Sequence, residues 1–322
     1  MITKSGACWS TVIAFVVLGL LATVPAASAQ TVLTACQSLP TGNYVLGKDI
    51  TTSGTCFTIT GPNVAIDLKG HSITGDGTGS GTGITDNGGQ NNAVISNGKI
   101  SKFLRGIDLL ESGSATINKM DVTNNADNGM RIGRCCNTIN SVKADNNADT
   151  GIELDQCCNT VVNSQANNNV GDGVDTFGGD SEVSGSTASN NAGDGFDLLD
   201  GDNFAINDTA NSNGNQGIHS NASGDNGVTN CTTNKNTDDG IELLGGFNLV
   251  TNSKSTGNGG AGIDVSFDTN NEVTNSQANK NTGDGVAIEC PGNVLLLSAK
   301  GNSGGNLVTS GGTCTLLDNK AP

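Results

Sequence analysis

A glycine followed by an apolar residue recurs along most of the chain, and its regular spacing restricts the fold more than any other feature. The interval is 22 or 23 residues, and the glycines are Gly83, Gly106, Gly129, Gly151, Gly173, Gly195, Gly217, Gly240, Gly262 and Gly285. Each interval contains short stretches in which every second residue is apolar or small, as in strands with one buried face. The density of Asn and Gly disfavours a helix. Three short strands per repeat predict a solenoid of stacked β-coils.

Asparagines recur in phase with these glycines, in three columns. Four residues before a glycine stand Asn125, Asn147, Asn169, Asn191, Asn213, Asn236, Asn258 and Asn281. Ten before stand Asn163, Asn207, Asn230, Asn252 and Asn275, and fourteen before stand Asn137, Asn159, Asn203, Asn226, Asn248 and Asn271. Stacked asparagines hydrogen-bond from coil to coil and tolerate left-handed backbone at tight turns. We therefore expect these columns to be structural.

The coil period and the asparagine columns resemble those of the pectin-lyase-like superfamily. The resemblance implies an all-β fold, a right-handed parallel β-helix of about ten coils over residues 61–310. Residues 30–60 are expected to form an N-terminal cap, and residues 311–322 a C-terminal cap or tail. Caps are needed because open strand edges recruit other chains.

The first 29 residues have the composition of a secretory signal peptide. Lys4 precedes an apolar run over residues 11–24, and Ala27-Ser28-Ala29 is a typical cleavage site. We therefore expect a secreted, extracellular or cell-surface monomer with no membrane span after cleavage. The net charge of −16 excludes a basic nucleic-acid groove, because an acidic surface repels phosphates.

Eight cysteines form two sets. One pair lies in or beside each expected cap, Cys36 with Cys56 and Cys290 with Cys314, and each pair is expected to form a disulfide. Two adjacent pairs repeat after 22 residues, Cys135-Cys136 and Cys157-Cys158. The second set lies on neighbouring coils, about 4.8 Å apart, which suits disulfides between coils. A four-thiolate metal site is the alternative.

The position two residues after each glycine points outward and is mostly charged. This outward row is Asp108, Arg131, Glu153, Asp175, Asp197, His219, Glu242 and Asp264. Asp172 and Asp194 stand directly before their glycines and add carboxylates to the same patch. Stacked like charges are unfavourable, so water and salt, raised pKa values or a cation must relieve them. Asp172, Asp175, Asp194 and Asp197 are the candidate ligands of Ca²⁺, which prefers oxygen.

Three hypotheses fit this row: a solvated acidic face, a Ca²⁺ site that stiffens the coil or bridges to an acidic glycan, and a catalytic cleft. The polygalacturonase-like branch of the superfamily carries Asp, paired Asp and His on successive coils. Resemblance to it implies catalytic roles for Asp175, Asp194, Asp197 and His219. One acid would protonate the leaving oxygen, and a second carboxylate would activate water.

Other members of the row are candidate contacts to a polymer: Arg131, Glu153 and Glu242. The function that we expect is contact with extracellular polysaccharide or another surface polymer, with Ca²⁺ as the possible cofactor. The alternative is a polysaccharide hydrolase, lyase or epimerase that uses the outward row.

Overall fold

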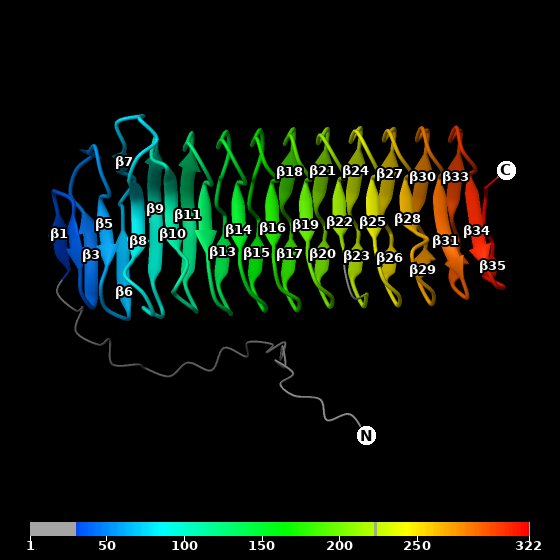
Figure 1. The fold of residues 1–322 in the computed structure, drawn as a ribbon, viewed down its shortest axis with the longest axis horizontal. Coiled ribbons are helices and arrows are strands. Elements are labelled where there is room, and N and C mark those ends of the chain that lie inside the picture. The colour runs from blue at the N-terminus through cyan, green and yellow to red at the C-terminus, as the bar shows by residue number, and fades with distance from the viewer. Residues whose placement is uncertain (1–29, 222–223, 322) are drawn as a thin grey trace, which may run out of the picture.

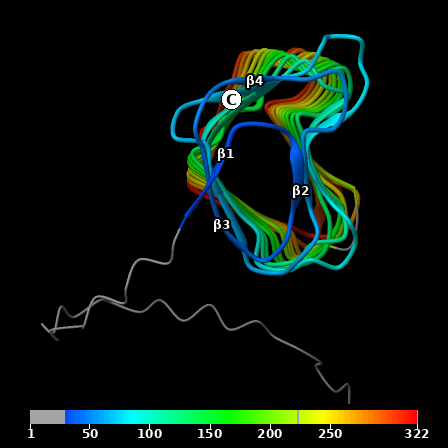
Figure 2. The ribbon, with the colours of Figure 1, turned by 90° about the vertical axis from the view of Figure 1, so that its left-hand side faces the viewer.

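The computed structural model describes residues 30–221 and 224–321. Strands and turns wind into a right-handed parallel β-helix, which confirms the predicted fold class (Figure 1). Viewed along the axis, the coils superimpose on one closed outline (Figure 2). The expected signal peptide lies outside the described residues.

The solenoid has three parallel sheets, in which each strand pairs with strands of the neighbouring coils. Two sheets, of 16 and 13 strands, run its length, and the third has six strands and covers only the C-terminal part. Sheet B, which carries the outward row, contains Gln37–Leu39 (β2), Phe57–Ile59 (β5), Thr82–Asp86 (β8), Arg105–Leu109 (β10), Met130–Ile132 (β12), Ile152–Leu154 (β14), Val174–Thr176 (β16), Phe196–Leu198 (β19), Ile218–Ser220 (β22), Ile241–Leu243 (β25), Ile263–Val265 (β28), Val286–Cys290 (β31) and Leu307–Gly311 (β34).

Sheet A contains Thr31–Leu33 (β1), Gly42–Leu46 (β3), Ile50–Thr51 (β4), Val64–Asp67 (β6), Ser72–Thr74 (β7), Val94–Ser101 (β9), Thr116–Thr123 (β11), Thr138–Asn140 (β13), Thr160–Val162 (β15), Glu182–Ser184 (β17), Phe204–Ile206 (β20), Gly227–Thr229 (β23), Leu249–Thr251 (β26), Glu272–Thr274 (β29), Asn293–Leu295 (β32) and Thr315–Leu317 (β35). Sheet C contains Thr187–Ser189 (β18), Thr209–Asn211 (β21), Thr232–Asn234 (β24), Lys254–Thr256 (β27), Gln277–Asn279 (β30) and Ser298–Lys300 (β33).

The core lies inside the coils and consists of stacked aliphatic side chains. Ile152, Ile218 and Ile241, each directly after its glycine, are fully buried, as the alternation predicts. The glycines themselves are packed tightly: a Cβ on Gly195 would lie 2.5 Å from the carbonyl oxygen of Gly217. The recurring glycine is therefore needed for close approach between coils.

Two of the three asparagine columns are buried hydrogen-bond ladders. In the column four residues before the glycine, the Nδ2 of Asn191 donates to Oδ1 of Asn213 at 3.2 Å, and Asn213 donates to Asn236 at 3.1 Å. The column that begins at Asn137 and Asn159 is linked in the same way. The column ten residues before the glycine lies instead at exposed turns with positive φ, such as 59° at Asn207.

The helix continues beyond the repeats that the glycines mark. Sheet B has 13 strands rather than about ten, because β2, β5 and β34 add coils at the two ends. Leu39, Phe57 and Ile59 fill the interior there without the glycine signature. The two expected disulfides are present, Cys36–Cys56 and Cys290–Cys314.

The adjacent cysteine pairs are on neighbouring coils, as expected, and are reduced in the structure. The Sγ atoms of Cys135 and Cys157 are 3.0 Å apart. The asparagine ladder from Asn137 to Asn159 fixes the register of these two coils. Among the described residues, these four thiols do not form a cluster compact enough to hold a metal ion, so nothing favours a four-thiolate site.

In an oxidising environment, Cys135 is expected to form a disulfide with Cys157, because their sulfurs need only a small movement to bond. Peptide mapping of the unreduced protein should yield the two peptides linked through these residues. A map in which Cys135 and Cys157 are alkylated as free thiols, or are paired elsewhere, would contradict this expectation.

Within residues 30–221 and 224–321, no helix is long and apolar enough to cross a membrane.

Candidate functional site

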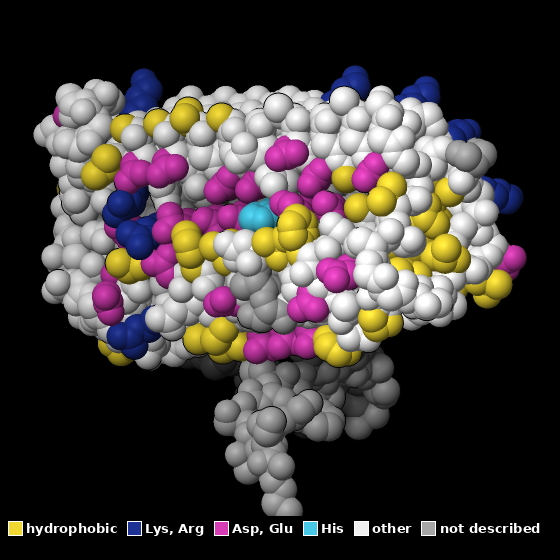
Figure 3. All heavy atoms as spheres, turned by 45° about the vertical axis from the view of Figure 1, so that its right-hand side comes forward, with side chains coloured by type: hydrophobic (Ala, Val, Ile, Leu, Met, Phe, Trp, Pro, Cys, Tyr) yellow, Lys and Arg dark blue, Asp and Glu magenta, His cyan; other side chains and the backbone are white. Residues whose placement is uncertain are grey.

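The outward row of sheet B is in register over consecutive coils. Backbone pairing places Glu153 beside Asp175, Asp175 beside Asp197, and Asp197 beside His219. His219 is followed by Glu242, and Glu242 by Asp264. Figure 3 shows the result as a band of acidic side chains that contains one histidine. The row that the sequence predicts is therefore a continuous surface.

Three carboxylates meet at the centre of this band. One oxygen from each of Asp172, Asp175 and Asp197 lies within 4.8 Å of the other two. Asp175 is only 7% exposed, and its Oδ1 is buried with no hydrogen-bond partner among the described residues. Burial, together with the charges of Asp197 and Asp172, raises the pKa of Asp175 to about 9. Without a cation, Asp175 therefore carries a proton at neutral pH.

The aspartates that precede the glycines have a structural role as well. The Oδ1 of Asp172 accepts the backbone N–H of Asp194 at 2.6 Å, and the Oδ1 of Asp194 accepts that of Gln216 at 2.7 Å. One oxygen of each carboxylate thus holds the next coil. Burial, then the charge of Asp197, raises the pKa of Asp194 to about 7, and burial also raises the pKa of Asp172.

His219 lies between acidic groups on both sides. Its Nδ1 is 2.9 Å from Oδ1 of Asp197 and 3.8 Å from Oδ2 of Asp194, and its Nε2 is 3.6 Å from Oε2 of Glu242. Burial lowers the pKa of His219, but the hydrogen bond and charge of Asp197 outweigh it, and the net pKa is raised. Asp194, Asp197 and His219 also form a compact cluster, with a donor set that suits a transition metal.

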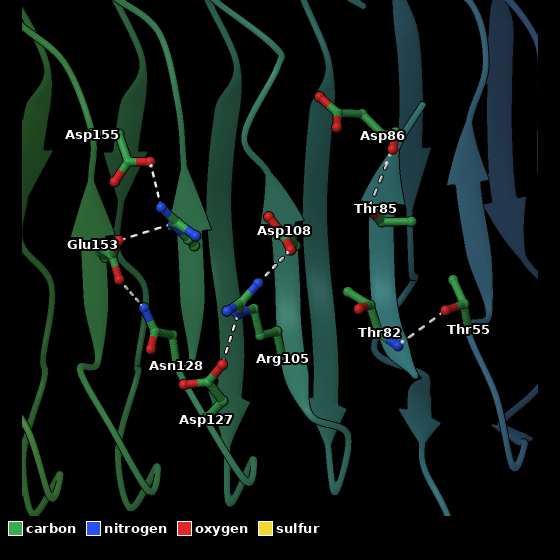
Figure 4. Close-up of polar contacts among 11 residues, drawn as sticks. Thr55, Thr82, Thr85, Asp86, Arg105, Asp108, Asp127, Asn128, Glu153 and Asp155 are labelled. Atoms are coloured by element: carbon green, nitrogen blue, oxygen red, sulfur yellow. Dashed lines mark hydrogen bonds and ion pairs between the residues drawn. The ribbon is translucent and has the colours of Figure 1, made fainter. Parts of the chain in front are cut away.

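The two arginines on this face are bound to carboxylates. Arg105 donates to Asp108 at 3.1 Å and to Asp127 at 2.9 Å (Figure 4). Arg131 pairs with Glu153 at 2.9 Å and with Asp155 at 3.1 Å. Both guanidinium groups are therefore engaged by these carboxylates rather than by the three central aspartates.

Glu153, expected as a polymer contact, is engaged with the chain itself. Asn128 donates to it, and burial, followed by contact with Asp155, raises the pKa of Glu153 to about 7. The third expected contact, Glu242, accepts a hydrogen bond from Gln216 Nε2 at 2.6 Å. The polymer-binding roles of Arg131, Glu153 and Glu242 stay predictions.

A second acidic cluster lies farther along the same face. It consists of Asp239, Glu242 and Asp264, whose oxygens lie within 4.8 Å of one another. Asp239 accepts the backbone N–H of Ala261, as its equivalents do on earlier coils. All its polar side-chain atoms have partners or remain accessible, so this cluster lacks the buried unpaired oxygen found at Asp175.

Three residues that contact the row were not predicted from the sequence: Gln216, Asn128 and Asp155. Gln216 and Asn128 stand directly before a glycine, in the same column as Asp172 and Asp194, so the repeat alignment contained the signal. Asp155 lies two residues after Glu153, on the turn that follows β14, and only its contact with Arg131 reveals its position.

Comparison with known proteins identifies the family of the fold. The family model for the right-handed β-helix region matches residues 49–188 and 176–321. The chain belongs to the right-handed β-helix family. No curated protein sequence shows significant similarity to it.

Solved structures share this β-helix fold at low sequence identity. The pectate lyase Pel9A matches with a TM-score of 0.52 and 20% identity. The match covers 86% of this chain and 70% of the pectate lyase chain. The A-module of the mannuronan C-5 epimerase AlgE4 from Azotobacter vinelandii has a TM-score of 0.53 and 15% identity, over 88% and 87%. A periplasmic alginate epimerase, AlgG, has a TM-score of 0.59 and 14% identity, over 91% and 79%. At such identities the likeness establishes the fold alone.

Proposed function

We propose that this β-helix protein acts outside the cytoplasm on a polysaccharide, which lies along the outward row of sheet B, and that a divalent cation is held there by Asp172, Asp175 and Asp197. The structural neighbours named above act on polysaccharides, which favours this class of ligand. The disulfides at both ends are typical of an oxidising compartment. Both support a secreted protein of this kind.

The observation that carries the cation site is the buried, unpaired oxygen of Asp175 beside two further carboxylates. Two ligands of one Ca²⁺ ion lie no more than about 5 Å apart, because Ca²⁺–oxygen distances are about 2.3–2.6 Å. The three carboxylates meet this limit at 4.8 Å. Protein and glycan oxygens or water would complete the shell. Ca²⁺ would supply charge neutralisation and a contact for an acidic group.

Added Ca²⁺ is expected to raise the melting temperature of the wild type and to leave Asp175→Asn unchanged. A ligand at a hundredfold excess over its Kd stabilises by about 2.7 kcal/mol, or about 5 °C for a protein of this size. Because Asp175 is neutral in the cation-free protein, its replacement by Asn should preserve the fold. Thermal melts with and without millimolar Ca²⁺ measure both.

Asp284→Asn is the matched control, since Asp284 occupies the same column as Asp172 and holds the next coil through Gly305. It should respond to Ca²⁺ as the wild type does. Equal melting curves for the wild type with Ca²⁺ and with EDTA would refute the cation site.

A second candidate, acid–base processing of the glycan, is favoured by one further observation. The hydrogen-bonded pair His219 and Asp197 lies beside the protonated carboxyl of Asp175. Asp175 could therefore donate a proton next to a pair that can accept one, as acid–base catalysis requires. Asp197→Asn is then expected to abolish depolymerisation or epimerisation and to retain the melting temperature. Absence of turnover by the wild type on a panel of acidic and neutral glycans would reject this candidate.

A further inference from the structure

The lysines of this acidic protein are segregated from its acidic band. In the C-terminal half, Lys254 and Lys300 project from sheet C, and Lys235 and Lys280 from the turn that follows it. All four are exposed. Figure 3 shows dark blue side chains along the upper edge of this half, away from the magenta band. We call these four residues the lysine ridge.

No carboxylate neutralises the lysine ridge. Strands β21, β24, β27, β30 and β33 contain no Asp or Glu, and none of the four lysines forms a salt bridge among the described residues. Elsewhere on the solenoid, Lys69 pairs with Asp67 and Lys143 with Asp145. The ridge is therefore a local positive surface on a chain of net charge −16.

A hollow of about 490 Å³ lies between Lys235 and Lys280. The residue between them in the column is Gly257, at a φ of +71°, and the lack of a side chain there leaves open space between the two lysines. They are two coils apart, roughly 10 Å from the strand spacing. Asn234 and Thr256 are among the residues that line the hollow.

An unsatisfied polar group lies beneath the wall of the hollow. The hydroxyl of Thr256 is buried and has no hydrogen-bond partner among the described residues, and the same holds for Oδ1 of Asn279, its partner on the next strand. Buried polar groups are normally hydrogen-bonded, so an unpaired hydroxyl beneath a hollow between two cations points to a ligand.

We propose that the lysine ridge is a second binding site, separate from the acidic band, for an anionic polysaccharide that runs along the solenoid axis. Its acidic groups would contact Lys235 and Lys280, and its hydroxyls would meet Asn234. The hollow has no aromatic lining on which bases could stack, which disfavours single-stranded nucleic acid. It has no large apolar side chain to insert into a lipid surface, which disfavours a membrane. This inference does not depend on the proposed cation site.

The test measures binding of polygalacturonate, dextran sulfate and neutral dextran to the full secreted chain in EDTA, at two salt concentrations. The wild type should bind both anionic polymers, more weakly at high salt, and should not bind neutral dextran. The double variant Lys235→Gln/Lys280→Gln should lose about tenfold or more in affinity, because two charge-assisted contacts are removed.

Two further variants distinguish binding at this specific site from attraction by the total number of positive charges. Lys48→Gln/Lys69→Gln removes the same charge at the other end of the solenoid and should bind as the wild type does. Gly257→Asn fills the hollow without a change in charge, and asparagine accepts the positive φ, so it should weaken binding. Asp175→Asn should leave this binding unaltered, which separates it from the acidic band.

Equal affinity of the wild type and Lys235→Gln/Lys280→Gln for both anionic polymers would overturn the proposal. So would tighter binding of single-stranded DNA or of anionic lipid vesicles than of either polysaccharide.

Discussion

Asp208→Ser is expected to melt at a higher temperature than the wild type at pH 8, and the two proteins should converge near pH 4. Asp208 is 1% exposed, and its carboxylate oxygens accept the backbone N–H groups of Ser186 and Ile206. Burial raises the pKa of Asp208 from 3.8 to about 8. The folded protein therefore keeps a proton that the unfolded chain releases.

The sign of the pH effect follows from this difference. An acid whose pKa is higher in the folded state stabilises the fold fully only below the unfolded pKa, and the contribution is lost as pH rises to the folded value. Between the unfolded and the folded pKa, each pH unit lowers the free energy of unfolding by about 1.4 kcal/mol, which amounts to about 4 kcal/mol at pH 7. Serine is the residue that this column carries on the two preceding coils, where Ser186 Oγ accepts the N–H of Ser164.

Urea unfolding of both proteins between pH 4 and 8 measures the difference. Asp268→Ser, at an exposed aspartate, is the control and should follow the wild type at every pH. Parallel stability curves for Asp208→Ser and the wild type would show that Asp208 ionises normally in the folded protein.

Asn213→Ala is expected to lower the free energy of unfolding by about 3 kcal/mol. Asn213 is 1% exposed and accepts the backbone N–H and the Nδ2 of Asn191, at 3.0 and 3.2 Å. Its own Nδ2 donates to the carbonyl oxygen of Ala188 at 3.1 Å. Alanine leaves these groups buried and unpaired, and the cost exceeds that of one ordinary hydrogen bond.

The exposed Asn215, two residues along, supplies the control for this experiment, and Asn215→Ala should change the stability little. Denaturant titration at neutral pH compares the two variants. A loss of under about 0.5 kcal/mol for Asn213→Ala would mean that the ladder does not stabilise the stack.

Much of the fold follows from the sequence because one period governs both chemistry and geometry. The glycine column, the buried aliphatic positions and two asparagine ladders lie where the repeat puts them. The end coils were not foreseen, since Leu39 and Phe57 fill the interior without the glycine and asparagine marks. Strand pairing needs only an apolar inner face, so the solenoid extends farther than its most visible motif.

The candidate site was predictable as a row but not as a set of contacts. Register alone places Asp175 beside Asp197, whereas the burial that leaves one oxygen of Asp175 unpaired depends on packing. The lysine ridge could not be predicted from the repeat, because Lys235 and Lys280 alternate with Gly257 and no column carries a lysine on every coil.

Crystallographic analysis of the protein in Ca²⁺, with anomalous differences recorded, tests the central claim most directly. We expect one peak bonded to Asp172, Asp175 and Asp197, at Ca²⁺–oxygen distances of about 2.3–2.6 Å. A well-ordered acidic band with no peak between these carboxylates, at Ca²⁺ concentrations that saturate any effect on melting, would contradict the account.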